Sequence, residues 1–392
     1  MKIELHMLQS FPPSNLNRDD SGMPKDCEFG GFRRARISSQ CLKRSIRYSD
    51  QFKKRIDSNI GTRTKYSLGN FKKELLKTDI EEDKAQVIAK IVLEQVIGKI
   101  DEDNKTSVLY YTDDKELANL ASIANEYSDQ IFELNKLISL QKKAKMESKE
   151  QKELSAIVTK ISKQFKDTYA NHIDSVDIAL FGRMLANTPT MKIDAACQVA
   201  HAISTNTISM DFDYFTAVDD LNPEGETGAG MIGSTAFNSA CYYRYSVIDS
   251  DQLMHNLGNK KELAKEGILG FIEGSVFAVP SGKKNAFAQN VQPDFVMVVI
   301  RENDAPANLA NAFEKPANPD NKKSLSENSI KKLAKHWKNL NTMYGFENNL
   351  VAVACTSLNQ LGALSANGNI TGSLKDVIAA TEEYLNANIR EA

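Results

Sequence analysis

The 392-residue sequence has no apolar run long enough to cross a membrane. Its longer runs, such as FVMVVI at 295–300, fall far short of the roughly 20 residues that a transmembrane helix needs. The first residues, MKIELHMLQ, lack the basic and apolar blocks of a secretion signal. We therefore expect a cytoplasmic protein without a membrane partner.

Paired cysteines are also missing. The five cysteines stand singly along the chain, with no CxxC pair: Cys27, Cys41, Cys197, Cys241 and Cys355. This spacing argues against a disulfide framework and against a zinc site, so we expect the cysteines to be buried like apolar residues. We expect no cofactor and no metal.

The sequence has no excess of positive charge, because 49 Lys and Arg residues face 51 Asp and Glu residues, for a net charge of −2. Binding of nucleic acid over the whole surface is excluded by this balance, so any such binding needs a local basic track. One such track is present. Residues 29–47, FGGFRRARISSQCLKRSIR, carry six basic side chains and no acidic one; we call this stretch the basic segment.

The fold class follows from the pattern of apolar residues. After residue 174, short apolar runs typical of strands are interleaved irregularly with helical patterns, which predicts an α+β fold. Helical, heavily charged patterns over 115–166 indicate a helical insertion. A long stretch at 205–236, rich in glycine near its end, shows no regular pattern and is typical of a functional or disordered segment.

The basic segment reads as a short strand over 33–37 followed by a helix over 39–48. Alternation places Arg34 and Arg36 on one face of the strand. Ser38 is a suitable N-cap for the helix.

Gln40, Lys43 and Arg47 fall at i, i+3 and i+7 and so form one stripe of the predicted helix. Like charges four residues apart cost about 0.2–0.5 kcal/mol in an isolated helix, and an anion beside the stripe reverses that cost. Phosphate is also favoured by the free N–H groups of the first turn. We expect this stripe to bind a sugar–phosphate backbone without reading bases. The alternative is a solvated helix whose basic residues pair with acids elsewhere.

Together with SNLNRDDSGMPKD at 14–26, the basic segment strongly resembles the start of the CasC family, the backbone subunit of the type I-E CRISPR Cascade complex in the RAMP superfamily. The blocks DIALFGRM, VAHAIS, DYFTAVDDL, YYRYSVI, VPSGKKN and ANAFEK resemble the same family in the same order. The resemblance covers most of the chain and is weakest over about 60–165.

This resemblance implies an RRM-like (ferredoxin-like) palm over 1–60 and 170–392, a long hairpin thumb over about 205–237, and helical fingers over 61–169. It also implies a subunit that binds guide RNA (crRNA) and presents it to target DNA in antiviral defence. The expected partners are other copies of the chain, stacked head-to-tail, and other Cascade subunits.

The resemblance also implies which residues contact the RNA. Its backbone contacts fall on Arg18, Lys25, Ser38, Gln40, Lys43 and Arg47. Met184 corresponds to a residue that packs on the RNA, and the thumb wedge to Tyr214, Phe215 and Val218, since an aromatic ring can slide between bases of any sequence. Core packing is the alternative for these side chains.

Basic side chains outside that pattern complete the expected contacts. They are Arg34, Arg36 and Arg44 of the basic segment, and Lys283 and Lys284 of a GKK loop that is not a P-loop. For Lys322 and Lys323 we expect a solvated loop instead.

An enzyme is the competing hypothesis, because the wider superfamily includes ribonucleases. The five histidines (His6, His172, His201, His255 and His336) show no partner spacing that fixes a shared site. Asp19, Asp20 and Asp26 are better candidates for metal-dependent cleavage of complementary RNA, although Asp side chains also serve as turn formers. We expect no catalytic residue. Four further acids beside the thumb form an acidic patch that suits a neighbour's basic surface: Asp211, Asp213, Asp219 and Asp220.

Overall fold

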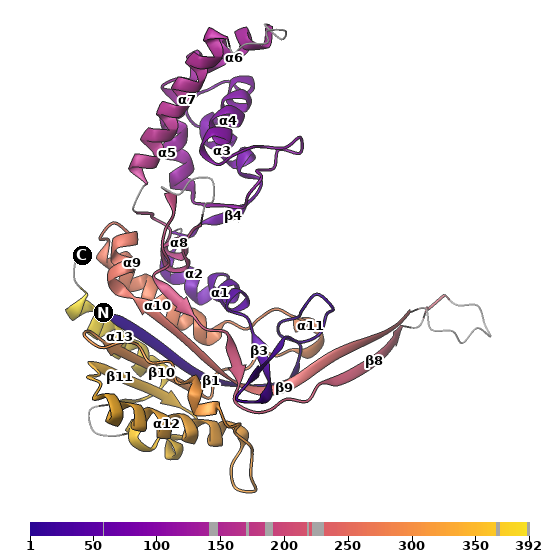
Figure 1. Ribbon diagram of the computed structural model, residues 1–392, viewed down its shortest axis with the longest axis vertical. Coiled ribbons are helices and arrows are strands. Elements are labelled where there is room, and N and C mark those ends of the chain that lie inside the picture. Colours follow the sequence, from indigo (N-terminus) through magenta and orange to yellow (C-terminus); the bar gives the residue numbers. More distant parts are fainter. Residues whose placement is uncertain are drawn as a thin grey trace. The chain divides into compact units, whose positions relative to one another are not determined.

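The computed structural model describes residues 1–57, 59–140, 148–169, 172–184, 191–217, 219–221, 231–365 and 369–389. They form an α+β chain, which confirms the predicted fold class (Figure 1). The chain separates into two compact units. The first unit takes 1–55, 197–250 and the chain from 265 onward, and the second takes 56–196 and 251–264.

One ten-stranded sheet organises the first unit, in the order β12–β11–β10–β1–β9–β7–β3–β2, with β6 and β8 also paired to β9. Only the β11–β12 pair is parallel among the pairings described. The strands are β1 (Lys2–Ser14), β2 (Asp26–Phe29), β3 (Phe32–Ile37), β6 (Cys197–Val199), β7 (Ala202–Ser204), β8 (Asp211–Ala217), β9 (Met231–Asp249), β10 (Phe295–Arg301), β11 (Leu350–Cys355) and β12 (Ile370–Gly372).

The central strand β1 is buried on both faces, so its polar residues need partners. The Glu4 carboxylate accepts hydrogen bonds from Tyr245 Oη (3.0 Å) and the Ala307 N–H (2.8 Å). His6 Nδ1 lies 2.8 Å from Tyr243 Oη. His6 is therefore a core residue with a partner for Nδ1, whereas its buried Nε2 has no hydrogen-bond partner among the described residues.

Two apolar clusters cover the sheet. Trp337 and Leu333 of α12 pack with Phe295 and Leu8 on one face. A second cluster joins Leu42 of α1 to strand residues that include Ala35, Ile37 and Tyr242. The helices of this unit are α1 (Ser39–Arg47), α2 (Asp50–Ile56), α10 (Lys261–Phe277), α11 (Lys284–Phe287), η2 (Ala310–Phe313), α12 (Leu325–Tyr344), η3 (Leu358–Gln360), η4 (Gly362–Ser365) and α13 (Leu374–Asn388).

Strands β8 and β9 form a long two-stranded ribbon that extends beyond the sheet (Figure 1). The pairing runs from Asp211↔Phe237 to Ala217↔Met231, and every residue of β8 is exposed. The lack of regular structure predicted over 205–236 is therefore wrong for 211–217 and 231–236.

The second unit is mainly helical. Its core includes Phe71, Val92, Leu120 and Phe165, of which the last two lie in the helical patterns predicted over 115–166. Its elements are α3 (Ser67–Leu76), α4 (Glu82–Val96), α5 (Asp114–Asn125), α6 (Ser128–Leu140), α7 (Lys149–Thr168), α8 (Val176–Phe181), α9 (Ser250–Asn256) and the pair β4 (Thr62–Thr64) and β5 (Tyr110–Thr112). Across the described ranges, no helix has the length and apolar character that a membrane crossing requires.

All five cysteines are free. Cys197 and Cys241 are buried as expected, and burial raises the pKa of Cys197 to about 12. The expectation is wrong for Cys27, Cys41 and Cys355, which are only half-buried.

Candidate nucleic-acid interface

Helix α1 begins where the sequence predicted. Ser38 is its N-cap, and its Oγ accepts a hydrogen bond from the Cys41 N–H (3.3 Å). Leu42 and Ile46 are buried beneath the helix. Gln40 on the outer side is exposed and Lys43 is half-buried. The helix therefore presents the polar stripe at the surface, while Ser38 itself is largely covered.

The loop over 15–26 is tied to β3 and α1. The Lys25 N–H donates to Asn17 O (2.8 Å), and the Arg36 N–H donates to Lys25 O (2.9 Å). Asn17 Oδ1 also accepts from the Ser38 N–H (2.9 Å). These bonds hold Arg18, which is exposed, beside the basic helix.

Arg18 and Arg44 line one groove of about 450 Å³ together with Ser281 and Gly282. We call it the N-terminal groove. It brings together three stretches that are far apart in the sequence: the loop, helix α1 and the GKK loop.

Gly282 fits because it has no side chain. A Cβ at this position would lie 2.5 Å from Leu16 O and 2.6 Å from Asn15 O, closer than atoms can approach. Lys283 follows in a left-handed backbone conformation (φ 49°) and is half-buried, and Lys284 is exposed. The GKK loop is thus anchored against the N-terminal loop.

A second groove of about 290 Å³ adjoins this region, and its charged lining residues are Lys25, Arg33 and Arg36 with the acids Asp19 and Asp26. Arg36 Nη1 lies 3.0 Å from His201 Nδ1. Burial, and then the charges of Arg36 and Lys25, lower the pKa of His201. The contact with Arg36 was not apparent from the sequence, and the lowered pKa favours the neutral form of His201.

Arg34 does not belong to the exposed basic surface, which corrects the prediction for this residue. Its side chain is fully buried. The guanidinium donates to four backbone carbonyls: Ser204 O (3.1 Å), Thr205 O (2.8 Å), Phe313 O (2.7 Å) and Glu314 O (3.2 Å). The alternation of β3 gives the face on which Arg34 lies. It does not reveal that residues 204–205 and 313–314 cover this face at Arg34.

The N-terminal groove carries charge of both signs, because Asp19 and Asp20 line it together with Arg18 and Arg44. Arg33 pairs with Asp26 (2.5 Å), whereas no ion pair joins Arg18, Lys25 or Arg44 to any residue in the described ranges. Beneath them Arg244 is buried, and its Nη1 donates to Gln9 Oε1 (2.6 Å). Burial lowers the pKa of Arg244 to about 10, which still leaves it charged at neutral pH.

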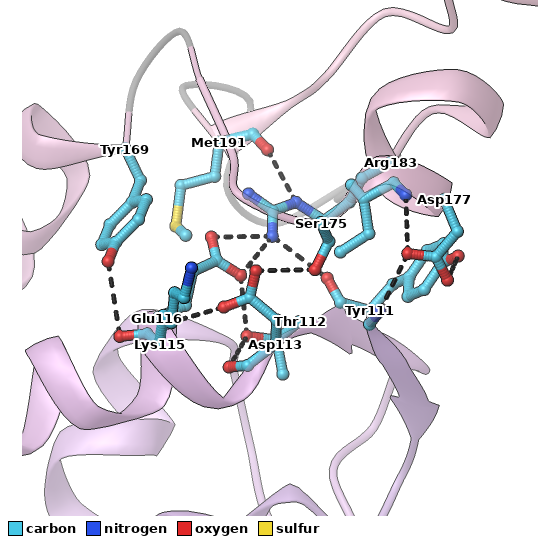
Figure 2. A network of polar contacts seen from close by, with 12 residues as sticks. Tyr111, Thr112, Asp113, Lys115, Glu116, Tyr169, Ser175, Asp177, Arg183 and Met191 are labelled. Atoms are coloured by element: carbon cyan, nitrogen blue, oxygen red, sulfur yellow. Dashed lines mark hydrogen bonds and ion pairs between the residues drawn. The ribbon is translucent and has the colours of Figure 1, made fainter. Parts of the chain in front are cut away.

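Met184 lies in the second unit and is 87% exposed, so it is not a core residue. The preceding Arg183 is buried, and its Nη1 donates to both carboxylate oxygens of Glu116 (2.9 and 2.7 Å). Figure 2 shows this pair within a network that also contains Asp113 and Ser175, whose Oγ donates to Asp113 Oδ2 (2.6 Å). The network fixes the backbone that carries Met184.

Tyr214 and Phe215 lie on the β8–β9 hairpin and are 65% and 36% exposed, which excludes core packing for both. As neighbours in a strand, they point to opposite faces. The Phe215 ring covers Gly233, where a Cβ would lie only 2.4 Å from Phe215 Cζ. Val218 lies outside the described residues.

Two of the three candidate nuclease acids, Asp19 and Asp26, have structural partners. Asp19 Oδ1 accepts from the Ser21 N–H (3.0 Å), Ser21 Oγ (2.8 Å) and the Met23 N–H (2.9 Å), and these bonds lower the pKa of Asp19. Asp26 pairs with Arg33. Within the described ranges, no three His, Cys, Asp or Glu side chains are grouped to hold a metal ion.

Comparison with known proteins supports one family. The sequence profile of the CT1975-like protein family (Cas_CT1975) matches residues 3–380. No curated protein is similar enough in sequence to count as a relative.

Two solved structures are similar to this chain. A chain of a "CRISPR RNA-guided surveillance complex, pre-nicking" is 26% identical, with a TM-score of 0.78 over 99% of this chain and 100% of that one. A chain of a "CRISPR RNA-guided surveillance complex" is 24% identical, with a TM-score of 0.71 over 98% and 100%, and shows the fold alone. The resemblance to subunits of such complexes is thereby confirmed, and the chain belongs to the CT1975-like family of Cas proteins.

Proposed function

We propose that the chain is the guide-RNA-binding backbone subunit of a Cascade complex of type I-E. In this proposal the first unit is the RRM-like palm, the β8–β9 hairpin is the thumb and the second unit supplies the helical fingers. Several copies stack head-to-tail along one guide RNA in the cytoplasm. They hold its backbone and present its bases to target DNA, together with other Cascade subunits.

The N-terminal groove is the observation that carries this proposal. Arg18, Arg44 and the loop of Gly282 meet there, next to the stripe of α1. These side chains offer cations, and the loop and helix offer N–H groups, which suit phosphate but distinguish no base. One such groove in a chain of net charge −2 binds weakly. Copies that share one RNA gain affinity through multivalency.

The direct experiment compares guide binding by the Lys43→Ala/Arg47→Ala variant with binding by the native chain. Binding should weaken to the same degree for unrelated spacer sequences, and its dependence on salt should decrease. Lys331→Ala/Lys338→Ala, which removes two exposed lysines of α12, serves as the matched control and should change little. A loss confined to particular sequences would contradict a backbone-only contact.

We further propose that the subunit does not cleave RNA. The hydrogen bonds of Asp19 and the ion pair of Asp26 support this proposal, because they give both carboxylates a structural role. Complementary RNA incubated with the assembled complex and Mg²⁺ should stay intact. Regular cuts that disappear in Asp19→Ala or Asp26→Ala would establish a metal-dependent ribonuclease instead.

A further inference from the structure

One groove of the first unit lies outside the predicted RNA contacts. It has a volume of about 800 Å³ and is lined by the turn after β2, the segment around 311–318 and helix α12. Three lysines line it: Lys315, Lys332 and Lys335. We call it the lysine groove.

None of these lysines forms an ion pair with a described residue. Lys332 Nζ instead donates to Lys315 O (2.8 Å) and Pro316 O (2.9 Å). Arg34 takes the two preceding carbonyls, Phe313 O and Glu314 O. Four successive carbonyls are thus bound by two cations that have no carboxylate partner.

This arrangement makes the wall of the groove both rigid and positive. Burial, and then the charges of Arg34 and Lys315, lower the pKa of Lys332, as expected where positive charge is crowded. Glu314 is the one acid in the lining, so positive charge still dominates. Such a site favours a polyanion, because an anion relieves the repulsion among the cations.

The other residues that line the groove indicate which kind of polyanion it binds. Phe32 is 43% exposed at the edge of the groove. Gly30 approaches Glu314 O so closely that a Cβ would lie 2.2 Å away, which fixes the turn that carries the ring. Amide side chains also face the groove: Asn311, Asn318 and Asn339. The aromatic ring can stack on a base, and the amides can form hydrogen bonds with base edges, so both favour nucleic acid. An acidic protein surface would use neither group.

We infer that the lysine groove binds single-stranded nucleic acid, with phosphates on Lys315 and Lys335 and a base stacked on Phe32. This site goes beyond the proposed function. Arg34 supports the lysine groove and points to one face of β3. Ala35 and Ile37 point to the opposite face, which packs against α1.

The test uses the full chain carrying Lys43→Ala and Arg47→Ala, so that the stripe of α1 contributes little. Fluorescent 12-residue single strands of uridine or of deoxythymidine serve as probes, which separates RNA from DNA as the ligand. Adding Lys315→Gln and Lys335→Gln should lower the affinity about tenfold for at least one probe. Losing two phosphate contacts should also reduce the slope of log affinity against log salt by about 1.4.

The matched control adds Lys331→Gln and Lys338→Gln, which remove equal charge from α12 outside the groove and should change affinity less than twofold. Phe32→Leu should weaken binding about fivefold or more and abolish photocrosslinking of a 5-bromouracil probe to the peptide that contains residue 32. Equal effects of the two lysine pairs would overturn the inference. So would unchanged oligonucleotide binding with altered self-association, since the groove would then hold an acidic protein surface. Neither result bears on the Lys43 and Arg47 comparison that tests the proposed function.

Discussion

Gly282 shows how a single residue joins two distant parts of the candidate interface. Its Cα packs against the carbonyls of Asn15 and Leu16, so that any side chain there must push the two loops apart. We expect Gly282→Ala to cost about 1–3 kcal/mol of unfolding free energy, as overpacking does. Guide affinity should fall as well, because Arg18 and Lys283 lose their common support.

Urea unfolding and RNA titration of this variant check the prediction. Gly69→Ala is the control, since Gly69 lies in α3 and a Cβ there meets nothing within 4 Å. That change should leave guide affinity unaltered and stabilise the chain by about 0.4–1 kcal/mol. If Gly282→Ala kept the unfolding free energy and the guide affinity of the native chain, the contact of Gly282 with Asn15 and Leu16 would not support the interface.

Arg183 and Glu116 provide a second test at the scale of residues. Burial raises the pKa of Glu116, and the charge and hydrogen bonds of Arg183 oppose that rise. Arg183→Met leaves the carboxyl buried without its cation and should cost about 3–5 kcal/mol at neutral pH.

The cost should depend on pH in a definite direction. Without Arg183, the pKa of Glu116 in the folded chain lies further above its unfolded value of about 4.3, so the folded state binds the proton more tightly. The loss is therefore largest above the folded-state pKa and shrinks as pH falls towards the unfolded value. Unfolding at pH 8 and pH 5 measures the difference. Lys192→Met, which removes an exposed ion pair to Asp194, should have little effect at either pH. An equal loss for Arg183→Met at both pH values would rule out this account.

At the scale of elements, local signals predicted helix α1 well. Ser38, Leu42 and Ile46 act as cap and core because those roles depend on neighbours in the sequence. The burial of Arg34 was missed, since it depends on carbonyls at 204–205 and 313–314 that only the folded sheet brings near. The contact of Gly282 with residues 15 and 16 was invisible for the same reason. The sequence PSG at 280–282 is typical of a turn, but it does not indicate which distant residues this loop contacts.

The residue pattern missed the β8–β9 hairpin for a different reason, and only the resemblance suggested it. Strand β8 and the first residues of β9 bury little, so they lack the apolar pattern by which strands are recognised, and glycines suggested irregular structure. The resemblance alone marked Tyr214 and Phe215 for a wedge role. Their opposite orientations and the place of Gly233 under the Phe215 ring come from the structure.

The hairpin prediction uses this geometry. If Phe215 separates bases of the guide, Phe215→Ala should reduce the fluorescence of 2-aminopurine placed at the unstacked positions. Gly233→Val should act in the same direction, because its side chain displaces the ring. Thr235→Val, on the same face of β9 but paired with Asp213, is the control and should keep the native signal. Undiminished fluorescence in Phe215→Ala would assign the wedge to another residue.

At the scale of the whole molecule, the nearly neutral chain carries a group of acidic side chains on the β8–β9 hairpin. Asp211, Asp213, Asp219 and Asp220 are all exposed on the hairpin. If this acidic patch meets a basic surface of the next copy, Asp219→Lys/Asp220→Lys should reduce assembly on guide RNA about tenfold or more while single-copy binding persists. Sedimentation on guide RNA measures it, with Glu382→Lys/Glu383→Lys on α13 as the control. Unchanged assembly of the Asp219/Asp220 variant would remove the patch from the interface.

The family and the α+β class could be predicted from the sequence, because several multi-residue blocks occur in order along most of the chain. The lysine groove could not, since its lysines become neighbours of Phe32 only when β3 joins the sheet.

Native mass spectrometry of the chain on RNAs of three lengths and two unrelated sequences tests the central claim most directly. If several copies hold a sugar–phosphate backbone without reading bases, the number of bound copies should rise in proportion to RNA length and be the same for both sequences. A single bound copy at every length, or a number that follows sequence rather than length, would contradict the account.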